Sequence, residues 1–292
     1  MILFLNQFIN GLHVGSIYAL IALGYTMVYG IIKLINFAHG DILMIGAYTI
    51  VVTVSLMGWP IALAIVVSIA VCVLFGVVIE RVAYKPLRSS PKISSLITAI
   101  GVSMLLQNGA QIVFSPNPKP FPILLNVPPL SIGPLQISFT TILTFAVAVI
   151  SMVLLQGFVS TVKMGKAMRA VSEDMDAAQL MGINANHTIT ATFAIGCALA
   201  GVGALLYCMA YPTVSPSLGS LPGIKAFIAA VLGGIGIMPG AMIGGFILGI
   251  AESLTKGYIS SQLSDAVVYG ILIIVLLFKP AGLLGKSVRE KV

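Results

Sequence analysis

The sequence contains very little charge. Of its 292 residues only 8% are Asp, Glu, Lys or Arg and 59% are hydrophobic, against about a quarter charged in an ordinary soluble domain. Crossing about 30 Å of hydrocarbon takes about 20 apolar residues as a helix, so the chain has room for roughly eight or nine spans. This composition excludes a soluble catalytic domain. It predicts an all-α, polytopic integral membrane bundle forming a single domain over residues 1–292.

Patterns that carry chemistry are also scarce. Cys72, Cys197 and Cys208 lie in apolar runs without the spacing of a disulfide or a metal site, so we expect small packing residues. Residues 285–287 read Gly-Lys-Ser, as in a phosphate-binding loop, but the first glycine of that motif is missing. We therefore expect no enzymatic activity, no metal and no cofactor bound by this chain.

Acidic residues are nearly absent from the apolar runs. Ion-coupled carriers keep charged groups at membrane depth, and here we expect only Glu252 to be buried, paired with Lys256 one helical turn later. An ion-coupled secondary transporter is therefore a less favoured alternative.

Basic residues predict the topology. They form three clusters: Arg81, Lys85, Arg88 and Lys92; Lys163, Lys166 and Arg169; and Lys279, Lys286, Arg289 and Lys291. The positive-inside rule places these clusters in the cytoplasm. No Lys or Arg precedes Lys33 and no signal-peptide pattern is present. We therefore expect a retained first span, an external N-terminus and a cytoplasmic C-terminus. The clusters lack interleaved aromatic residues, which argues against nucleic acid as a partner.

The apolar runs predict the spans. They cover residues 4–31, 41–57, 60–79, 93–114, 137–159, 189–211 and 266–278. Between 115 and 136 repeated prolines predict an extended external loop. Residues 224–258 are apolar but interrupted by glycines, and we expect two segments of about 15 residues, each short for a crossing. Counting them as two crossings gives nine spans, and counting them as a re-entrant hairpin gives seven.

Two interpretations of this glycine-rich region stay open. Short, Gly/Pro-interrupted segments line pathways in transporters, which would give Gly233, Gly234 and Gly236 a pathway or gating role. The three Gly-x-x-x-Gly pairs between Gly236 and Gly249 also have the spacing that lets helices pack closely.

The sequence NFAHGD contains three further candidates, Asn36, His39 and Asp41. These residue types favour helix starts, so the three could cap the second span. The alternative is a role in gating or in contact with a cytoplasmic partner.

One polar stretch, residues 163–187, interrupts the apolar chain on the predicted cytoplasmic side. Its centre reads as a short amphipathic helix that presents Met175, Ala177, Ala178 and Met181 together and is broken at Gly182. It is either a simple loop between spans or a helix that docks into a groove of another protein.

Residues Asp176-Ala177-Ala178-Gln179-Leu180-Met181-Gly182, followed by Ile183, resemble the Glu-Ala-Ala-x-x-x-Gly coupling motif of bacterial ABC importer permeases, with Asp in place of Glu. Residues 15–41, 79–90 and 224–252 closely resemble the corresponding stretches of the LivH-type permeases of high-affinity branched-chain amino-acid importers. Together with the coupling loop these stretches are distributed along most of the length of the chain.

The resemblance implies a permease subunit that moves Leu, Ile or Val into the cytoplasm across the bacterial inner membrane. Its implied partners are a second related permease, two ATPase subunits that bind ATP and Mg, and an extracytoplasmic amino-acid-binding protein. The ATPase would dock at Asp176, Ala177, Ala178, Gly182 and Ile183. Related permeases carry urea or other amides, which leaves a urea or amide permease as the alternative.

Overall fold

The computed structural model describes residues 2–88, 90–122, 127–132 and 135–285, and these are overwhelmingly helical, as predicted. The basic residues Lys286, Arg289 and Lys291 of the predicted cytoplasmic tail lie outside the described residues. The helices are α1 (Ile2–Ile32), α2 (His39–Val51), α3 (Ile61–Ile79), α4 (Lys92–Phe114), α5 (Phe139–Thr161), α6 (Lys163–Glu173), α7 (Met175–Leu180), α8 (Ala185–Ala210), α9 (Ser220–Gly233), α10 (Met238–Tyr258) and α11 (Ser264–Phe278).

Short irregular elements complete the fold. A π-helical turn extends α2 over Val52–Leu56, and a second π-helical turn followed by a 3₁₀ turn extends α3 to Leu87. The proline-rich loop of residues 115–136, which was predicted to be extended, contributes most of the strands. β1 (Lys119–Pro120) pairs antiparallel with β4 (Thr213–Val214), and β2 (Leu130–Ile132) pairs antiparallel with β3 (Leu135–Ile137).

Seven helical segments in the described part of the chain are long and apolar enough to cross a membrane, and α9 and α11 are shorter apolar helices. The predicted positions of the spans agree with the observed helices to within a few residues. One prediction is wrong in the glycine-rich region. There α9 has only 14 residues, but α10 has 21 and meets the length for a crossing, because it starts at Met238 and runs unbroken past its glycines.

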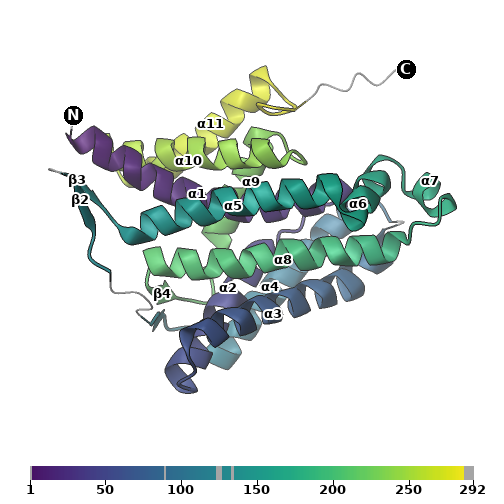
Figure 1. The fold of residues 1–292 in the computed structure, drawn as a ribbon, viewed down its shortest axis with the longest axis horizontal. Helices are drawn as coiled ribbons and strands as arrows, with labels where there is room; N and C mark the ends of the chain where they lie inside the picture. Colours follow the sequence, from purple (N-terminus) through teal and green to yellow (C-terminus); the bar gives the residue numbers. More distant parts are fainter. Residues whose placement is uncertain (1, 89, 123–126, 133–134, 286–292) are drawn as a thin grey trace.

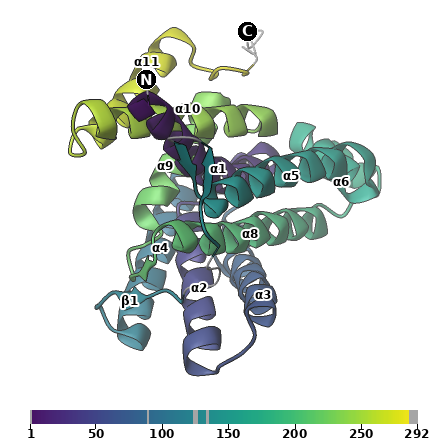
Figure 2. The same cartoon turned by 60° about the vertical axis from the view of Figure 1, so that its left-hand side comes forward.

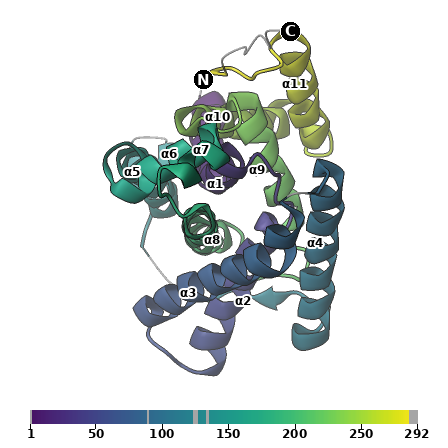
Figure 3. The ribbon, with the colours of Figure 1, turned by 90° about the vertical axis from the view of Figure 1, so that its right-hand side faces the viewer.

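Most of the long helices share one direction. In Figure 1, α1, α5, α8 and α10 run along the long axis, with the N-terminus at one end and α6 and α7 at the other. Figure 2 shows α2, α3 and α4 on the opposite side of α8 from α10 and α11. Figure 3 looks nearly down α1, α5 and α8, whereas α4 and α9 lie across that view. The helix α9 therefore crosses the main bundle direction instead of following it.

Glycines bring α10 into backbone contact with α1. A Cβ added at Gly11 of α1 would lie 2.6 Å from Ile250 Cα, and one added at Gly15 would lie 2.9 Å from the carbonyl oxygen of Gly245. A Cβ at Gly249 would in turn overlap the backbone of Gly15. We call this contact the α1–α10 glycine seam. Without a hydrophobic force between helices in lipid, such close approach is a main source of association, so the packing interpretation holds at these positions.

Gly233, Gly234 and Gly236 make the turn between α9 and α10. A Cβ at Gly233 would overlap the backbone of Gly240, and Gly234 and Gly236 have φ values of +107° and +93°, which other residues adopt only with strain. The structure thus gives these three glycines a role in reversing the chain between two packed helices.

Candidate functional site

The polar segment of residues 163–187 forms two short helices at the end of the bundle opposite the N-terminus (Figure 1). The first of them, α6, is amphipathic and buries Gly165, Met168 and Val171. Arg169 holds it to the end of α5 by donating from Nη2 to the Ser160 carbonyl oxygen at 3.0 Å. The polar segment is therefore an ordered pair of helices attached to the bundle.

Helix α7 has a defined start and stop. The Asp174 carboxylate caps it by accepting hydrogen bonds of 2.9 Å from the backbone N–H groups of Asp176 and Ala177. The helix ends at Leu180, and Gly182 then takes a φ of +83° while the Ile183 N–H donates back to the Ala178 carbonyl at 3.0 Å. This confirms the predicted short helix broken at Gly182.

The outer face of α7 differs from the prediction. Ala178 is only 4% exposed, because it faces inward to the same buried cluster as Val171 and Ile189. Leu180 and Met181 are instead 89% and 83% exposed. Ala178 is therefore not presented together with Met181. Sequence reasoning missed Leu180, although its place beside Met181 just before the glycine was the available signal.

The candidates at the start of α2 are buried but do not cap it. Ala38 is the N-cap residue, and no side chain caps this end, so the capping interpretation is wrong. The reason is that each of the three side chains interacts with a residue of another helix instead of with the backbone at the start of α2. The Asn36 side-chain oxygen Oδ1 accepts a hydrogen bond from the Tyr84 hydroxyl at 3.1 Å, and an Asp41 carboxylate oxygen accepts one from Gln107 Nε2 at 2.9 Å.

His39 has no hydrogen-bond partner in the described part of the chain and packs against the ring of Tyr25, with ring centroids 4.7 Å apart. Asn36 therefore faces the end of α3, His39 faces α1 and Asp41 faces α4. The three residues share one short stretch of chain but not one site.

Three carboxylates are buried among the described residues, at Asp41, Glu80 and Glu252, each at most 2% exposed. The expectation of a single buried acid at Glu252 is therefore wrong. Asp41 and Glu80 lie at the ends of apolar runs, where the sequence predicted exposed positions. In the fold other helices pack over both ends, so both side chains are buried. Glu80 pairs with Arg88 and accepts a hydrogen bond from the Thr190 hydroxyl at 2.8 Å.

Glu252 pairs with Lys256 at 2.6 Å, as predicted. The same oxygen also accepts from Lys225 of α9 at 2.8 Å, while the second oxygen accepts from the Tyr18 hydroxyl at 2.9 Å. Lys225 continues to Asp265 of α11 at 2.7 Å. This Lys225–Glu252 network joins α1, α9, α10 and α11, and the contacts of Lys225 could not be read from sequence spacing.

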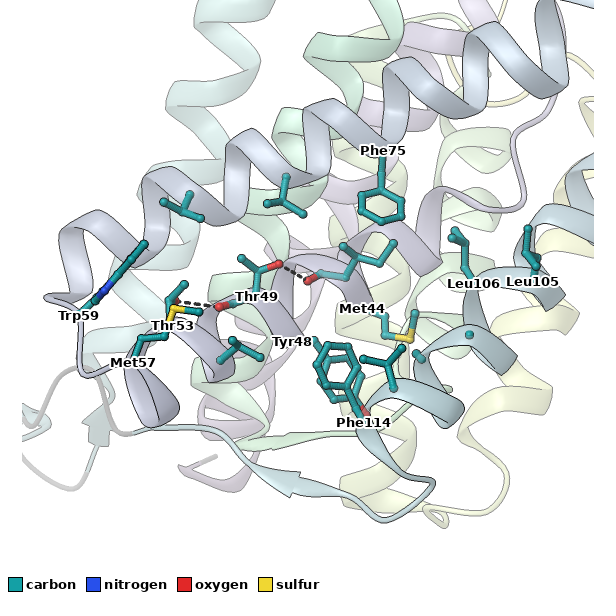
Figure 4. A pocket seen from close by; sticks show the side chains of 17 residues that line it. Met44, Tyr48, Thr49, Thr53, Met57, Trp59, Phe75, Leu105, Leu106 and Phe114 are labelled. Carbon is teal, nitrogen blue, oxygen red and sulfur yellow. Dashed lines mark hydrogen bonds between the residues drawn. The ribbon is translucent and has the colours of Figure 1, made fainter.

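Three of the cavities between the helices differ in their lining. The first, of about 560 Å³, lies between α2, α3 and α4 and is lined mostly by apolar side chains, with no charged one among them (Figure 4). Its Thr49 and Thr53 hydroxyls donate to carbonyls of their own helix, at 2.8 and 2.7 Å. At one end Tyr48 stacks on Phe114, with centroids 4.2 Å apart. This cavity suits hydrocarbon better than a charged ligand.

The other two cavities are more polar. One, of about 520 Å³, lies at the N-terminal end of α1 and is lined by Glu252, Lys256 and His13, whose Nδ1 lies 2.8 Å from the Thr141 hydroxyl. The last, of about 300 Å³, contains Asp41 and Gln107.

Seven helical segments of the described residues that are long and apolar enough to cross a membrane define a polytopic integral membrane protein. Residues 7–276 match the family described as the permease component of the branched-chain amino acid transport system, and the chain belongs to this family.

Curated relatives match over nearly the whole chain. The high-affinity branched-chain amino acid transport system permease protein BraD of Pseudomonas aeruginosa is 46% identical, with 99% of this chain and 98% of BraD covered. The permease protein LivH of Escherichia coli is 45% identical over the same shares. A probable branched-chain amino acid transport permease of Methanocaldococcus jannaschii is 32% identical, covering 92% of this chain and 89% of the relative. No solved structure matches the chain.

Proposed function

We propose that this chain is the membrane-embedded permease subunit of an ATP-driven ABC importer that carries Leu, Ile and Val into the cytoplasm. The observation that carries the proposal is the full-length similarity to BraD and LivH, both named as permeases of high-affinity branched-chain amino acid transport. The fold agrees with a permease role, because seven candidate spans fill most of the chain.

The proposed complex contains a second related permease, two ATPase subunits that hold ATP and Mg, and an extracytoplasmic protein that delivers the amino acid. It lies in the bacterial inner membrane with the N-terminus of this chain outside. The basic residues Lys163, Lys166 and Arg169 support a cytoplasmic position for α6 and α7.

The ATPase subunit would dock on α7 and the turn that follows it. Two exposed apolar side chains, Leu180 and Met181, support this role, because a helix that lies in a groove contributes apolar anchors. Asp176 and Ala177 are exposed on the same helix, and Gly182 and Ile183 form the turn. Ala178 supports the docking surface from behind through its packing on the bundle.

Reconstituted transport tests the function. We expect proteoliposomes that contain the four membrane and ATPase subunits, with ATP enclosed and the binding protein outside, to accumulate labelled leucine. The same vesicles without ATP should accumulate none. ATP-dependent uptake of urea in place of leucine would overturn the proposed substrate, and uptake by this chain alone without ATP would overturn the proposed class.

A further inference from the structure

Asp41 differs from the other two buried carboxylates in having no cation beside it. Glu80 pairs with Arg88, and Glu252 pairs with Lys225 and Lys256. Asp41 is 1% exposed and forms no ion pair within the described residues. Moving one ionised group from water into a protein interior costs several kcal/mol unless a partner of opposite charge offsets the penalty. A cation that arrives with a ligand would supply that partner.

The Gln107 side chain links Asp41 to two serine hydroxyls. The Gln107 side-chain amide has two protons, yet three acceptors lie within reach of its nitrogen. These are the Asp41 carboxylate at 2.9 Å, the Ser103 hydroxyl at 3.1 Å and the Ser220 hydroxyl at 3.2 Å. A ligand with several N–H donors would complete this group. The two serine hydroxyls would still be able to donate to an anionic part of the ligand.

These groups line a cavity of about 300 Å³, at the small end of the range for ligand pockets, about 300–1,000 Å³. Phe37, Ile100 and Ile224 give the same cavity an apolar wall. Ile100 and Ile224 are 44% and 40% exposed, so the cavity opens to the surface between them. It therefore offers an acid, hydroxyl donors and an apolar wall within one small volume.

Two helix starts meet at this cavity. A Cβ added at Gly219 would overlap the Gly40 backbone, and one added at Gly223 would lie 3.0 Å from Gly40 Cα and 3.5 Å from the Tyr25 hydroxyl. The first turns of α2 and α9 thus touch beside α1, well inside its candidate span. Neither start carries a side-chain cap. The start of α2 already holds the Asp41 carboxylate in its first turn, whereas the start of α9 carries no acid, so the positive end of α9 suits the carboxylate of a substrate.

We propose that this cavity binds the transported aliphatic amino acid as a zwitterion. The ammonium group pairs with Asp41, the carboxylate accepts from the Ser220 hydroxyl at the start of α9 and from the Ser103 hydroxyl of α4, and the side chain packs on Ile100 and Ile224. This assignment rests on the proposed function and names a substrate site within this chain. The cavity beside Glu252 and Lys256 is the weaker candidate, because its charges already neutralise one another.

Photo-crosslinking with photo-leucine, a diazirine analogue of leucine, locates the site. The assembled importer in nanodiscs, without its binding protein, is irradiated and its labelled peptides are mapped by mass spectrometry. We expect labels on Phe37, Ile100 or Ile224. Excess leucine should suppress them, and 4-methylpentanoate, which lacks the ammonium group, should not.

The variant Asp41→Asn keeps the acceptor for Gln107 but loses the charge, and labelling should fall at least tenfold. Asp265→Asn on α11 is the matched control and should label like wild type. If Asp41→Asn does not assemble, Ile100→Trp blocks the mouth of the cavity and should give the same loss.

Equal labelling in Asp41→Asn, or labels confined to the cavity around His13, would overturn the site. ATP-driven leucine uptake by the wild-type importer is measured in the same preparation. If wild-type uptake is present while the site fails, the proposed function stands, and if wild-type uptake of leucine is absent, the proposed function itself fails.

Discussion

Leu180 and Met181 are the two apolar side chains of the α6–α7 segment that the bundle leaves almost fully exposed. If the ATPase subunit covers them, a charge at either position must be buried without a partner. We expect Leu180→Glu to lower ATPase association at least tenfold in pull-down assays from solubilised membranes. Leu180→Met, which keeps an apolar side chain, should associate normally. Unchanged association of Leu180→Glu would leave α7 as a linker between spans.

Substitutions at Gly182 distinguish backbone strain within this chain from steric exclusion by the ATPase subunit. Its φ is +83° and no atom lies within 4 Å of an added Cβ, so a substitution meets strain but no clash within this chain. Asn tolerates this conformation better than Ala or Val. We therefore expect Gly182→Asn to retain more ATPase association than Gly182→Ala, and Gly182→Val to retain least. If all three lose association equally, the partner must exclude any side chain at this position.

Glu252 is the shared acceptor of the network on α1, α9, α10 and α11. Removing its charge leaves Lys225 buried with only Asp265 beside it. Breaking such a buried pair costs about 3–5 kcal/mol, so Glu252→Gln should lower the unfolding temperature of the purified chain markedly. Asp265 is 48% exposed, and Asp265→Asn should change stability by less than about 1 kcal/mol. Similar unfolding temperatures for both variants would contradict this assignment.

At the scale of the helices, the α1–α10 glycine seam predicts position-dependent effects of one substitution. Gly249→Ala places a Cβ onto the Gly15 backbone and forces the two helices apart. Gly157→Ala in α5 meets nothing within 4 Å and improves helix propensity by about 1 kcal/mol. We expect the first to lower the unfolding temperature and the second to leave it unchanged or raise it. Equal effects would mean that the seam contributes little to stability.

Helix positions were predictable, because long apolar runs can satisfy their backbone groups in a bilayer only as helices. The short helix α7 was also predictable from its polar start and Gly182. The surroundings of Asp41 were not, since Gln107 and Ser220, which line the same cavity, lie 66 and 179 residues away in the sequence. The wrong capping interpretation of NFAHGD has the same cause. Local residue preferences describe a helix start but not the helices that pack beside it.

At the scale of the whole molecule, the predicted topology places the loop of residues 115–136 outside and the α6–α7 segment in the cytoplasm. The native cysteines are buried, so an introduced cysteine can be labelled selectively. In intact cells a membrane-impermeant maleimide should label Asn117→Cys in the external loop. In cells that make this chain without the ATPase subunits, Leu180→Cys should react only after the membrane is opened. Labelling of Leu180→Cys in intact cells would invert the topology and remove α7 from the ATPase side.

The α1–α10 glycine seam can form only late in the synthesis of the chain. It joins the two ends of the chain, and the bond from the Ser253 hydroxyl to the Gln7 carbonyl beside it spans 246 residues. At ribosomal rates of about 5–20 residues per second, about 11–45 seconds pass between the synthesis of the last residue of α1 and that of α10. During that time lipid must cover the glycine face of α1. If synthesis stops before α10, the glycine face of α1 has no partner helix in the truncated protein. We expect such a truncated chain to be degraded by membrane proteases.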